Sequence, residues 1–136
     1  MGPTAFALAG FAAWMLLLTL VLGFYRTSLV LGGRKVANTF RTDGSDTPGF
    51  GQRLTRARDN CYENLPIFAA LAVAADLAGR TAGVTDPLAP WLLLARIGQS
   101  VTHVISTSIP AVQIRFAFYL TQIAIMLWWA ILLLLR

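Results

Sequence analysis

The sequence predicts an all-α integral membrane protein that forms one domain with four membrane-spanning helices. Of its 136 residues, 57% are hydrophobic and only 12% are charged, whereas soluble domains are roughly 45–50% apolar and about 25% charged. The apolar residues also fall in long stretches separated by polar segments. A chain this short has too little interior to hide so much apolar surface from water. A soluble globular enzyme and an intrinsically disordered chain are therefore both excluded.

The length of the chain fits four spans and no separate soluble domain, so residues 1–136 are expected to form one domain. Each span needs about 20 apolar residues, so four use roughly 80 positions and leave about 56 for loops and ends. Cys61 is the only cysteine, which excludes an intrachain disulfide, and we expect it to be a small apolar filler. The net charge of +5 indicates the cytoplasmic face of a membrane protein rather than nucleic-acid binding.

Hydropathy places the four expected spans along the chain. They are residues 5–25, 60–80, 88–107 and 116–135. No basic residue precedes the first span and no small-residue cleavage pattern follows it, so it is expected to be a retained anchor rather than a cleaved signal peptide. Polar residues interrupt the third stretch, and an interfacial helix over residues 88–107 is the alternative to a span.

A long polar loop is expected between the first two spans, over residues 26–59. It contains seven of the eleven basic residues, namely Arg26, Arg34, Lys35, Arg41, Arg53, Arg56 and Arg58. Arg115 lies on the third connection, which shares a side of the membrane with this loop if there are four spans. The positive-inside rule then predicts that both connections are cytoplasmic and that both termini are outside.

Two sets of polar residues recur at helical spacing, the first made up of Arg56, Asn60 and Glu63 and the second of Arg96, Gln99, Ser100 and His103. Each set falls on one face of a helix, within arcs of roughly 60° and about 100°. A charge at mid-bilayer costs roughly 2.5–3.5 kcal/mol, so these faces should meet each other, a neighbouring subunit or a wet cavity. The stripes predict either a pocket for an anionic or zwitterionic guest or an internal network. In that network Arg56 or Arg96 would neutralise Glu63.

No metal site is expected, because His103 is the only histidine and no cluster of Cys or carboxylate residues accompanies it. His103 itself is expected to be a packed polar residue, with proton transfer or hydrogen bonding to a ligand as the alternative. Arg115 begins the last span beside the basic side of the protein. On this pattern alone it is expected to be an interface anchor.

Residues 56–68 carry a recognisable signature. The stretch RARDNCYENLPIF contains the pattern R-A-x-x-N-x-x-E-x-x-P-x-F, with Arg56, Ala57, Asn60, Glu63, Pro66 and Phe68 at the matching positions. It resembles the MAPEG superfamily (membrane-associated proteins in eicosanoid and glutathione metabolism), in the form of a bacterial-type member. Leukotriene synthases of that family also have the pair seen here as Asn60-Cys61.

The resemblance implies a four-helix bundle protomer in a homotrimer, with glutathione bound between subunits near the cytoplasmic side. The arginine, asparagine and glutamate of the motif contact glutathione in the family, which transfers to Arg56, Asn60 and Glu63. Basic residues of the first loop hold its carboxylates, which suggests Arg34, Lys35 and Arg53. An arginine at the start of the fourth helix stabilises the thiolate, and Arg115 is the matching catalytic candidate.

The third helix departs from the family pattern. Members similar to prostaglandin E synthase have R-x-x-H-x-x-x-Y there, and their tyrosine helps to bind glutathione. This chain has Arg96, then Gln99 at the histidine position and His103 at the tyrosine position, which makes His103 a candidate for the cofactor site. Asn64 stands where leukotriene synthases have a tyrosine.

The resemblance implies an enzyme of the bacterial inner membrane that uses glutathione or a related thiol, without a metal. It would conjugate or reduce a lipophilic small-molecule electrophile that arrives through the bilayer, as a transferase or a peroxidase, with isomerase activity as a lesser option. The alternative is a non-catalytic MAPEG-fold scaffold or accessory subunit of a larger membrane complex. A third is a small proton-coupled transporter that uses Glu63.

Overall fold

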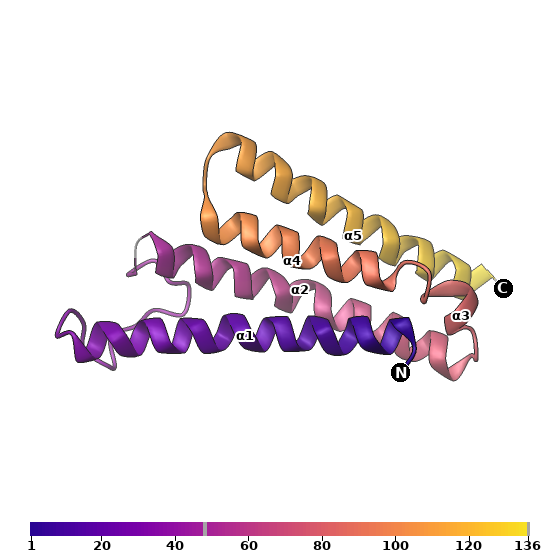
Figure 1. Ribbon diagram of the computed structural model, residues 1–136, viewed down its shortest axis with the longest axis horizontal. Helices are drawn as coiled ribbons and strands as arrows, with labels where there is room; N and C mark the ends of the chain where they lie inside the picture. The colour runs from indigo at the N-terminus through magenta and orange to yellow at the C-terminus, as the bar shows by residue number, and fades with distance from the viewer. Residues whose placement is uncertain (48, 136) are drawn as a thin grey trace.

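The computed structural model describes residues 1–47 and 49–135, and these are helical throughout apart from turns and one loop. The helices are α1 (Pro3–Leu31), α2 (Phe50–Leu77), α3 (Thr81–Val84), α4 (Ala89–Ile105) and α5 (Ile109–Leu135) (Figure 1). The described residues contain no β-strand. The all-α class expected from the sequence is confirmed.

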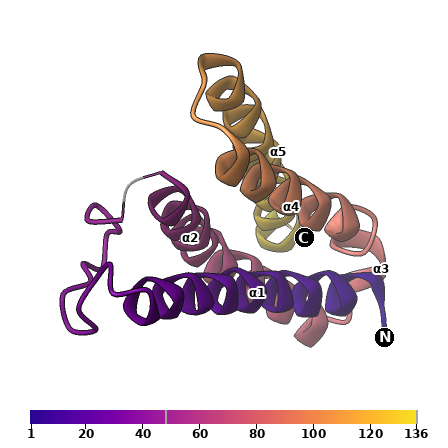
Figure 2. The same cartoon turned by 60° about the vertical axis from the view of Figure 1, so that its left-hand side comes forward.

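The four long helices run up and down beside one another, with α2 and α4 between α1 and α5 (Figure 1). Helix α1 packs against α2 and α4, whereas α5 packs mainly against α4. Both termini and α3 lie at one end, and the two polar connections lie at the other. Toward that polar end α5 leans away from α1 and α2, as Figure 2 shows from a second direction.

Only two of the helices are clearly apolar enough to cross a membrane by length and hydropathy, namely α1 and α5. Helix α4 has 17 residues, and both α2 and α4 carry the polar stripes identified in the sequence. Those stripes lower the mean hydropathy of the two central helices. Hydropathy therefore supports two of the four expected spans.

The loop expected over residues 26–59 is shorter in the structure, because α1 continues to Leu31 and α2 already begins at Phe50. An apolar stretch marks the hydrocarbon depth, whereas helical hydrogen bonding can continue into the polar layer beyond it. Glycines with positive φ flank the connection, with φ of 68° at Gly33 and 71° at Gly49. Glycine adopts this left-handed conformation without steric cost, so these two residues help to set the ends of the loop.

An aromatic core joins the helices. The ring centroids of Phe11 and Phe68 are 6.0 Å apart, and those of Phe68 and Trp129 are 5.7 Å apart. The three residues come from α1, α2 and α5 and are all fully buried. Tilted aromatic pairs of this kind stabilise a core beyond the area that they bury, so this chain of rings fixes how the outer helices sit on α2.

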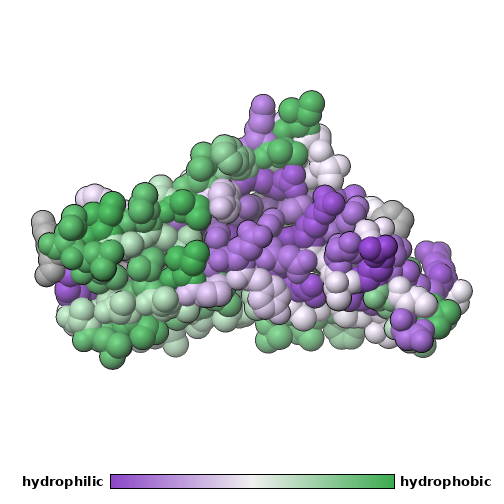
Figure 3. Space-filling model, turned by 180° about the vertical axis from the view of Figure 1, so that it is seen from behind, coloured by the Kyte–Doolittle hydropathy of each residue, from purple (hydrophilic) through white to green (hydrophobic). Residues whose placement is uncertain are grey.

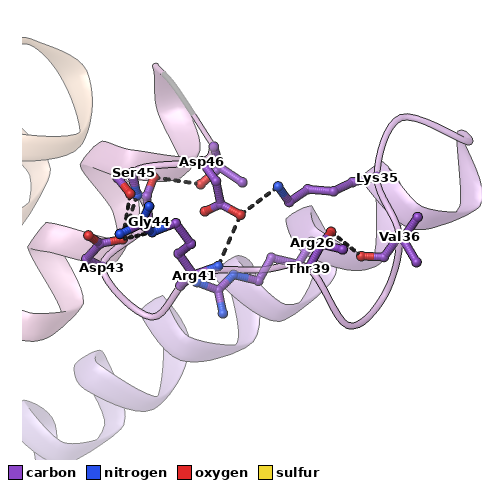
Figure 4. Close-up of polar contacts among 10 residues, drawn as sticks. Arg26, Lys35, Val36, Thr39, Arg41, Asp43, Gly44, Ser45 and Asp46 are labelled. Carbon is purple, nitrogen blue, oxygen red and sulfur yellow. Dashed lines mark hydrogen bonds and ion pairs between the residues drawn. The ribbon is translucent and has the colours of Figure 1, made fainter.

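The connection between α1 and α2 is folded around an ion pair (Figure 4). Lys35 Nζ lies 2.6 Å from Asp46 Oδ2, and the same carboxylate oxygen accepts a hydrogen bond of 3.0 Å from the backbone N–H of Arg41. The hydrogen bond from Lys35 is the main cause of a lowered pKa of Asp46, whose ordinary value is 3.8. The pair therefore stabilises the loop above that pH, and this contribution is lost as the pH falls through the lowered value.

Replacing Asp46 by asparagine is expected to loosen the loop and to speed tryptic cleavage after Lys35 and Arg41 several-fold at neutral pH. The reason is that cleavage of a folded segment follows the population of its open form. Asp43→Asn is the matched control, since the Asp43 pair with Arg41 is longer, at 3.7 Å, and exposed. Equal cleavage rates for the two variants would contradict this role of the Lys35–Asp46 pair.

Candidate ligand-binding site

A cavity of about 310 Å³ opens between α2, α4 and α5, toward the end of the molecule that carries the polar connections. It is lined by Arg56, Asn60, Gln99, His103, Val112, Arg115, Phe116 and Tyr119. The volume is at the lower end of the roughly 300–1,000 Å³ that is usual for small-molecule sites. Polar side chains from three helices therefore face one space.

Helical spacing explains why these side chains converge. Each of the three helices contributes a polar pair four residues apart, namely Arg56 with Asn60, Gln99 with His103, and Arg115 with Tyr119. Residues at i and i+4 lie on the same face of a helix. The cavity is thus the meeting place of one polar face from each helix.

The electrostatics of the cavity favour an anion. Arg56 is exposed and Arg115 is half-buried, and within the part of the chain that the structure describes neither takes part in an ion pair. Among the residues that the structure describes, no carboxylate lines the cavity. Two unpaired guanidinium groups over one cavity match the planar geometry of carboxylates.

His103 is held by Asn60 across the contact between α2 and α4. Asn60 Nδ2 lies 3.2 Å from His103 Nδ1, and His103 is only 6% exposed. This hydrogen bond fixes the orientation of the imidazole ring at the wall of the cavity. His103 is therefore both a packed polar residue and part of the lining.

A chain of buried amides lies behind the cavity. Gln122 Nε2 donates to Gln99 Oε1 at 2.9 Å, and Asn64 Nδ2 makes a longer contact of 3.5 Å with Gln122 Oε1. The three residues come from α5, α4 and α2 and are all buried. Amides removed from water are costly unless they are paired, and this chain pairs them while linking the three helices that form the cavity.

The structure brings together five of the residues singled out in the sequence, because the cavity is lined by Arg56, Asn60, Gln99, His103 and Arg115. Glu63 does not line it and is exposed on α2. It shares the angular position of Arg56 but lies about 10 Å further along the helix axis. At that depth the lining of the cavity has ended, so within one protomer Glu63 is not part of the site.

The other basic candidates lie outside the cavity lining as well. Arg53 Nε donates to the carbonyl oxygen of Val104 at 2.8 Å and so ties α2 to the end of α4. Arg34 is exposed just after α1, and Lys35 is engaged by Asp46. Arg34 and Lys35 thus lie on the loop between α1 and α2, whereas Arg53, in the first turn of α2, contacts α4 outside the cavity lining.

Arg96 belongs to the same sequence stripe as His103, but the structure places it in the core. Its side chain is fully buried, and its Cζ lies 5.3 Å from the centre of the Phe11 ring on α1. None of its three guanidinium nitrogens has a hydrogen-bond partner among residues 1–47 and 49–135. In the same described residues no ion pair links Glu63 to Arg56 or Arg96, which is contrary to the internal-network interpretation.

Sequence reasoning missed the contribution of α5 beyond Arg115. Tyr119 lines the cavity and Gln122 supports Gln99 behind it. Arg115, Tyr119 and Gln122 are spaced i, i+4 and i+7, the same pattern that identified the stripe on α2. The polar residues at this spacing on an otherwise apolar helix are the signal in the sequence that points to Tyr119 and Gln122.

Fold and site together define an all-α membrane protein with a cationic cavity between three of its helices. The chain belongs to the MAPEG family, because the family model with that description matches residues 4–135, nearly the whole chain. Comparison with curated proteins gave no match, and neither did comparison with solved structures. The family resemblance expected from residues 56–68 is thereby confirmed.

Proposed function

We propose that this protein is a membrane enzyme that uses glutathione, or a related thiol, to conjugate or reduce a lipophilic electrophile. The observation that carries the proposal is that Arg56 and Arg115, from two separate helices, line one cavity to which the described part of the chain contributes no carboxylate. Glutathione is an anionic peptide with a thiol, so it suits such a cavity. Membership of the MAPEG family supports the same proposed function.

In this proposal the chain positions the thiol and stabilises its anion. Arg56 binds a carboxylate of the peptide, and Asn60 adds a polar contact one turn away. Arg115 lies beside the sulfur and lowers the pKa of the guest thiol, as cations do for cysteine thiols. The thiol gives its proton to water, and the thiolate attacks the electrophile, which enters from the bilayer. In conjugation the new carbon–sulfur bond replaces the bond to the leaving group. In reduction of a peroxide the sulfur takes up one oxygen while the alcohol leaves, and a second thiol then releases that oxygen as water and forms the disulfide. Much of the rate enhancement comes from holding the two reactants in the right geometry.

We further propose that the working unit is a homotrimer of four-span protomers. Figure 3 shows a hydrophilic area that reaches from the polar end toward the middle of one face. Polar groups at membrane depth are costly against lipid, so a second copy over this face would stabilise it. The exposed Glu63 could then complete a site at the subunit boundary, together with Arg34, Lys35 and Arg53. The central helices α2 and α4 would cross the membrane inside the assembly.

The proposed orientation places the polar end, with the loop between α1 and α2, in the cytoplasm of a bacterium. Both termini then lie on the outer side of the inner membrane. The basic residues at the polar end support this orientation, since cytoplasmic segments carry an excess of lysine and arginine.

A second candidate is a non-catalytic scaffold or an accessory subunit of a larger membrane complex. Two observations favour it. Lys35 is engaged by Asp46 within the loop, and Gln99 and Asn64 belong to a buried amide chain where related enzymes have a histidine and a tyrosine. Such a protein would retain the fold without turning over a thiol.

Calorimetric titration of glutathione into the detergent-purified protein separates the two candidates. We expect saturable binding, which Arg56→Ala weakens by about tenfold to a hundredfold because a charged hydrogen bond is lost. Arg58→Ala is the matched control on the same helix, since Arg58 is paired with Asp59 at 2.7 Å and does not line the cavity. Absence of binding, or equal weakening by the two variants, would contradict the enzyme proposal.

A further inference from the structure

Gln122 has a side-chain orientation that the backbone determines. Its Nε2 lies 2.9 Å from the carbonyl oxygen of Phe118, and a backbone carbonyl can only accept a hydrogen bond. The group of Gln122 at that position must therefore be the NH2. The same NH2 lies 2.9 Å from the Gln99 side chain, so the group of Gln99 that faces it must be the carbonyl oxygen.

The fixed oxygen of Gln99 determines where its own NH2 group points. The oxygen and nitrogen of a carboxamide lie on opposite branches of one plane, so the NH2 is turned away from Gln122. Gln99 lines the cavity and is 5% exposed, and its Nε2 donates no hydrogen bond within the residues that the structure describes. A flipped Gln99 would place two NH2 groups face to face, so that the Gln99 NH2 and one N–H of the Gln122 NH2 would lack an acceptor, while the bond from Gln122 to the Phe118 carbonyl would remain.

We propose that Gln122 is a positioning residue that holds Gln99 as a hydrogen-bond donor to the cavity and thereby selects a guest with a negatively charged acceptor at that point. The donors run in one direction, from Asn64 to Gln122, from Gln122 to Gln99 and from Gln99 to the guest. The identity of the guest rests on the proposed function, whereas the orientation of the Gln99 amide, with its NH2 toward the cavity, does not.

The orientation of the Gln99 and Gln122 amides can be tested without any ligand. The chain has only four glutamines, Gln52, Gln99, Gln113 and Gln122, so selective ¹⁵N-glutamine labelling resolves their side-chain amides by NMR in detergent. We expect the Gln122 NH2 to be protected from exchange with water and the Gln99 NH2 to exchange rapidly through the open cavity. A protected Gln99 NH2 beside a rapidly exchanging Gln122 NH2 would overturn the inference.

The effect on binding is tested with Gln99→Glu, which keeps the shape and still accepts from Gln122 but presents an oxygen to the cavity. Glutathione should bind roughly tenfold to a hundredfold more weakly near neutral pH, because a donor to a charged group is replaced by a repelling anion. Relative to the native protein, affinity should recover at low pH, where the protonated carboxyl can donate. Native affinity near neutral pH for this variant would refute the selection of an anionic acceptor.

A double-mutant cycle tests whether Gln122 acts only through Gln99. Gln122→Leu should weaken glutathione binding several-fold in the native background and not at all in the Gln99→Leu background. Gln113→Leu is the control, since Gln113 is exposed on the same helix. Equal weakening by Gln122→Leu in both backgrounds would show a merely structural role.

Failure of the proposed function can be told apart from failure of this inference. If the native protein binds no glutathione while the Gln99 and Gln122 amides have the stated orientation, the proposed function fails and the positioning role stands.

Discussion

Replacing Arg115 by alanine is expected to lower the rate of conjugation of glutathione to a small nitroaryl chloride by about a hundredfold to a thousandfold. This is the usual cost of removing one group that stabilises charge in a reacting anion. Arg115 is half-buried in the second turn of α5 and lines the cavity, so its guanidinium is placed to contact a thiolate bound there. The rate is measured from the absorbance of the conjugate with protein in detergent.

The pH dependence of that rate distinguishes a catalytic effect from a loss of folding. Without the cation the guest thiol returns toward its ordinary pKa, so the rate of Arg115→Ala should rise with pH over a higher range than that of the native protein. Arg115→Lys keeps the charge and should retain part of the rate. If Arg115→Ala conjugated glutathione at the native rate, Arg115 would be only an interface anchor.

Replacing Arg96 by methionine is expected to raise the free energy of unfolding by about 1–4 kcal/mol. This is the range by which exchanging a buried ion pair for well-packed apolar residues of similar volume often stabilises a protein. Arg96 is fully buried, and its guanidinium has no hydrogen-bond partner in the described residues. Its contact with the Phe11 ring offsets only part of the cost, since a desolvated cation–π contact contributes about 2 kcal/mol.

Arg53→Met is the control. It makes the same chemical change, but its expected effect on stability has the opposite sign. Arg53 donates to the carbonyl oxygen of Val104, so its loss removes a tie between α2 and α4 and should lower stability. Thermal unfolding of both variants in the same detergent compares them directly. A lower melting temperature for Arg96→Met would show that an acceptor neutralises this guanidinium in the native protein.

The convergence of Arg56, Asn60, His103 and Arg115 was within reach of the sequence. Helical spacing placed Asn60 on the face of Arg56, and the family resemblance supplied Arg115 as a candidate from another helix. The high cost of charge in a bilayer required such residues to meet in a protected place. These arguments use only the angular position of a residue and its solvation cost, both of which follow from the amino-acid order.

The positions of Glu63 and Arg96 could not be predicted in this way. Periodicity gives the direction in which a residue points from its own helix, but not which neighbour it meets at that depth. Arg96 points to α1, whereas His103, about two turns further on, reaches the cavity beside α5. At the polar end α5 also leans away from α1 and α2 (Figure 2), and such a lean results from the packing of all the helices together.

The ends of the helices could not be predicted from the sequence pattern alone either. Hydropathy identified α1 and α5, which are long and apolar enough to cross a membrane, but it underestimated how far α1 and α2 extend beyond the apolar stretches. The ends of the loop depend on local contacts such as the Lys35–Asp46 pair. A hydropathy profile cannot register a contact between residues eleven positions apart.

An experimental structure determined with saturating glutathione tests the central claim most directly. We predict density for the tripeptide in the cavity between α2, α4 and α5, with a carboxylate against Arg56 and the sulfur beside Arg115. An empty cavity, or glutathione bound instead against the loop between α1 and α2, would contradict the proposal that this cavity holds an anionic thiol.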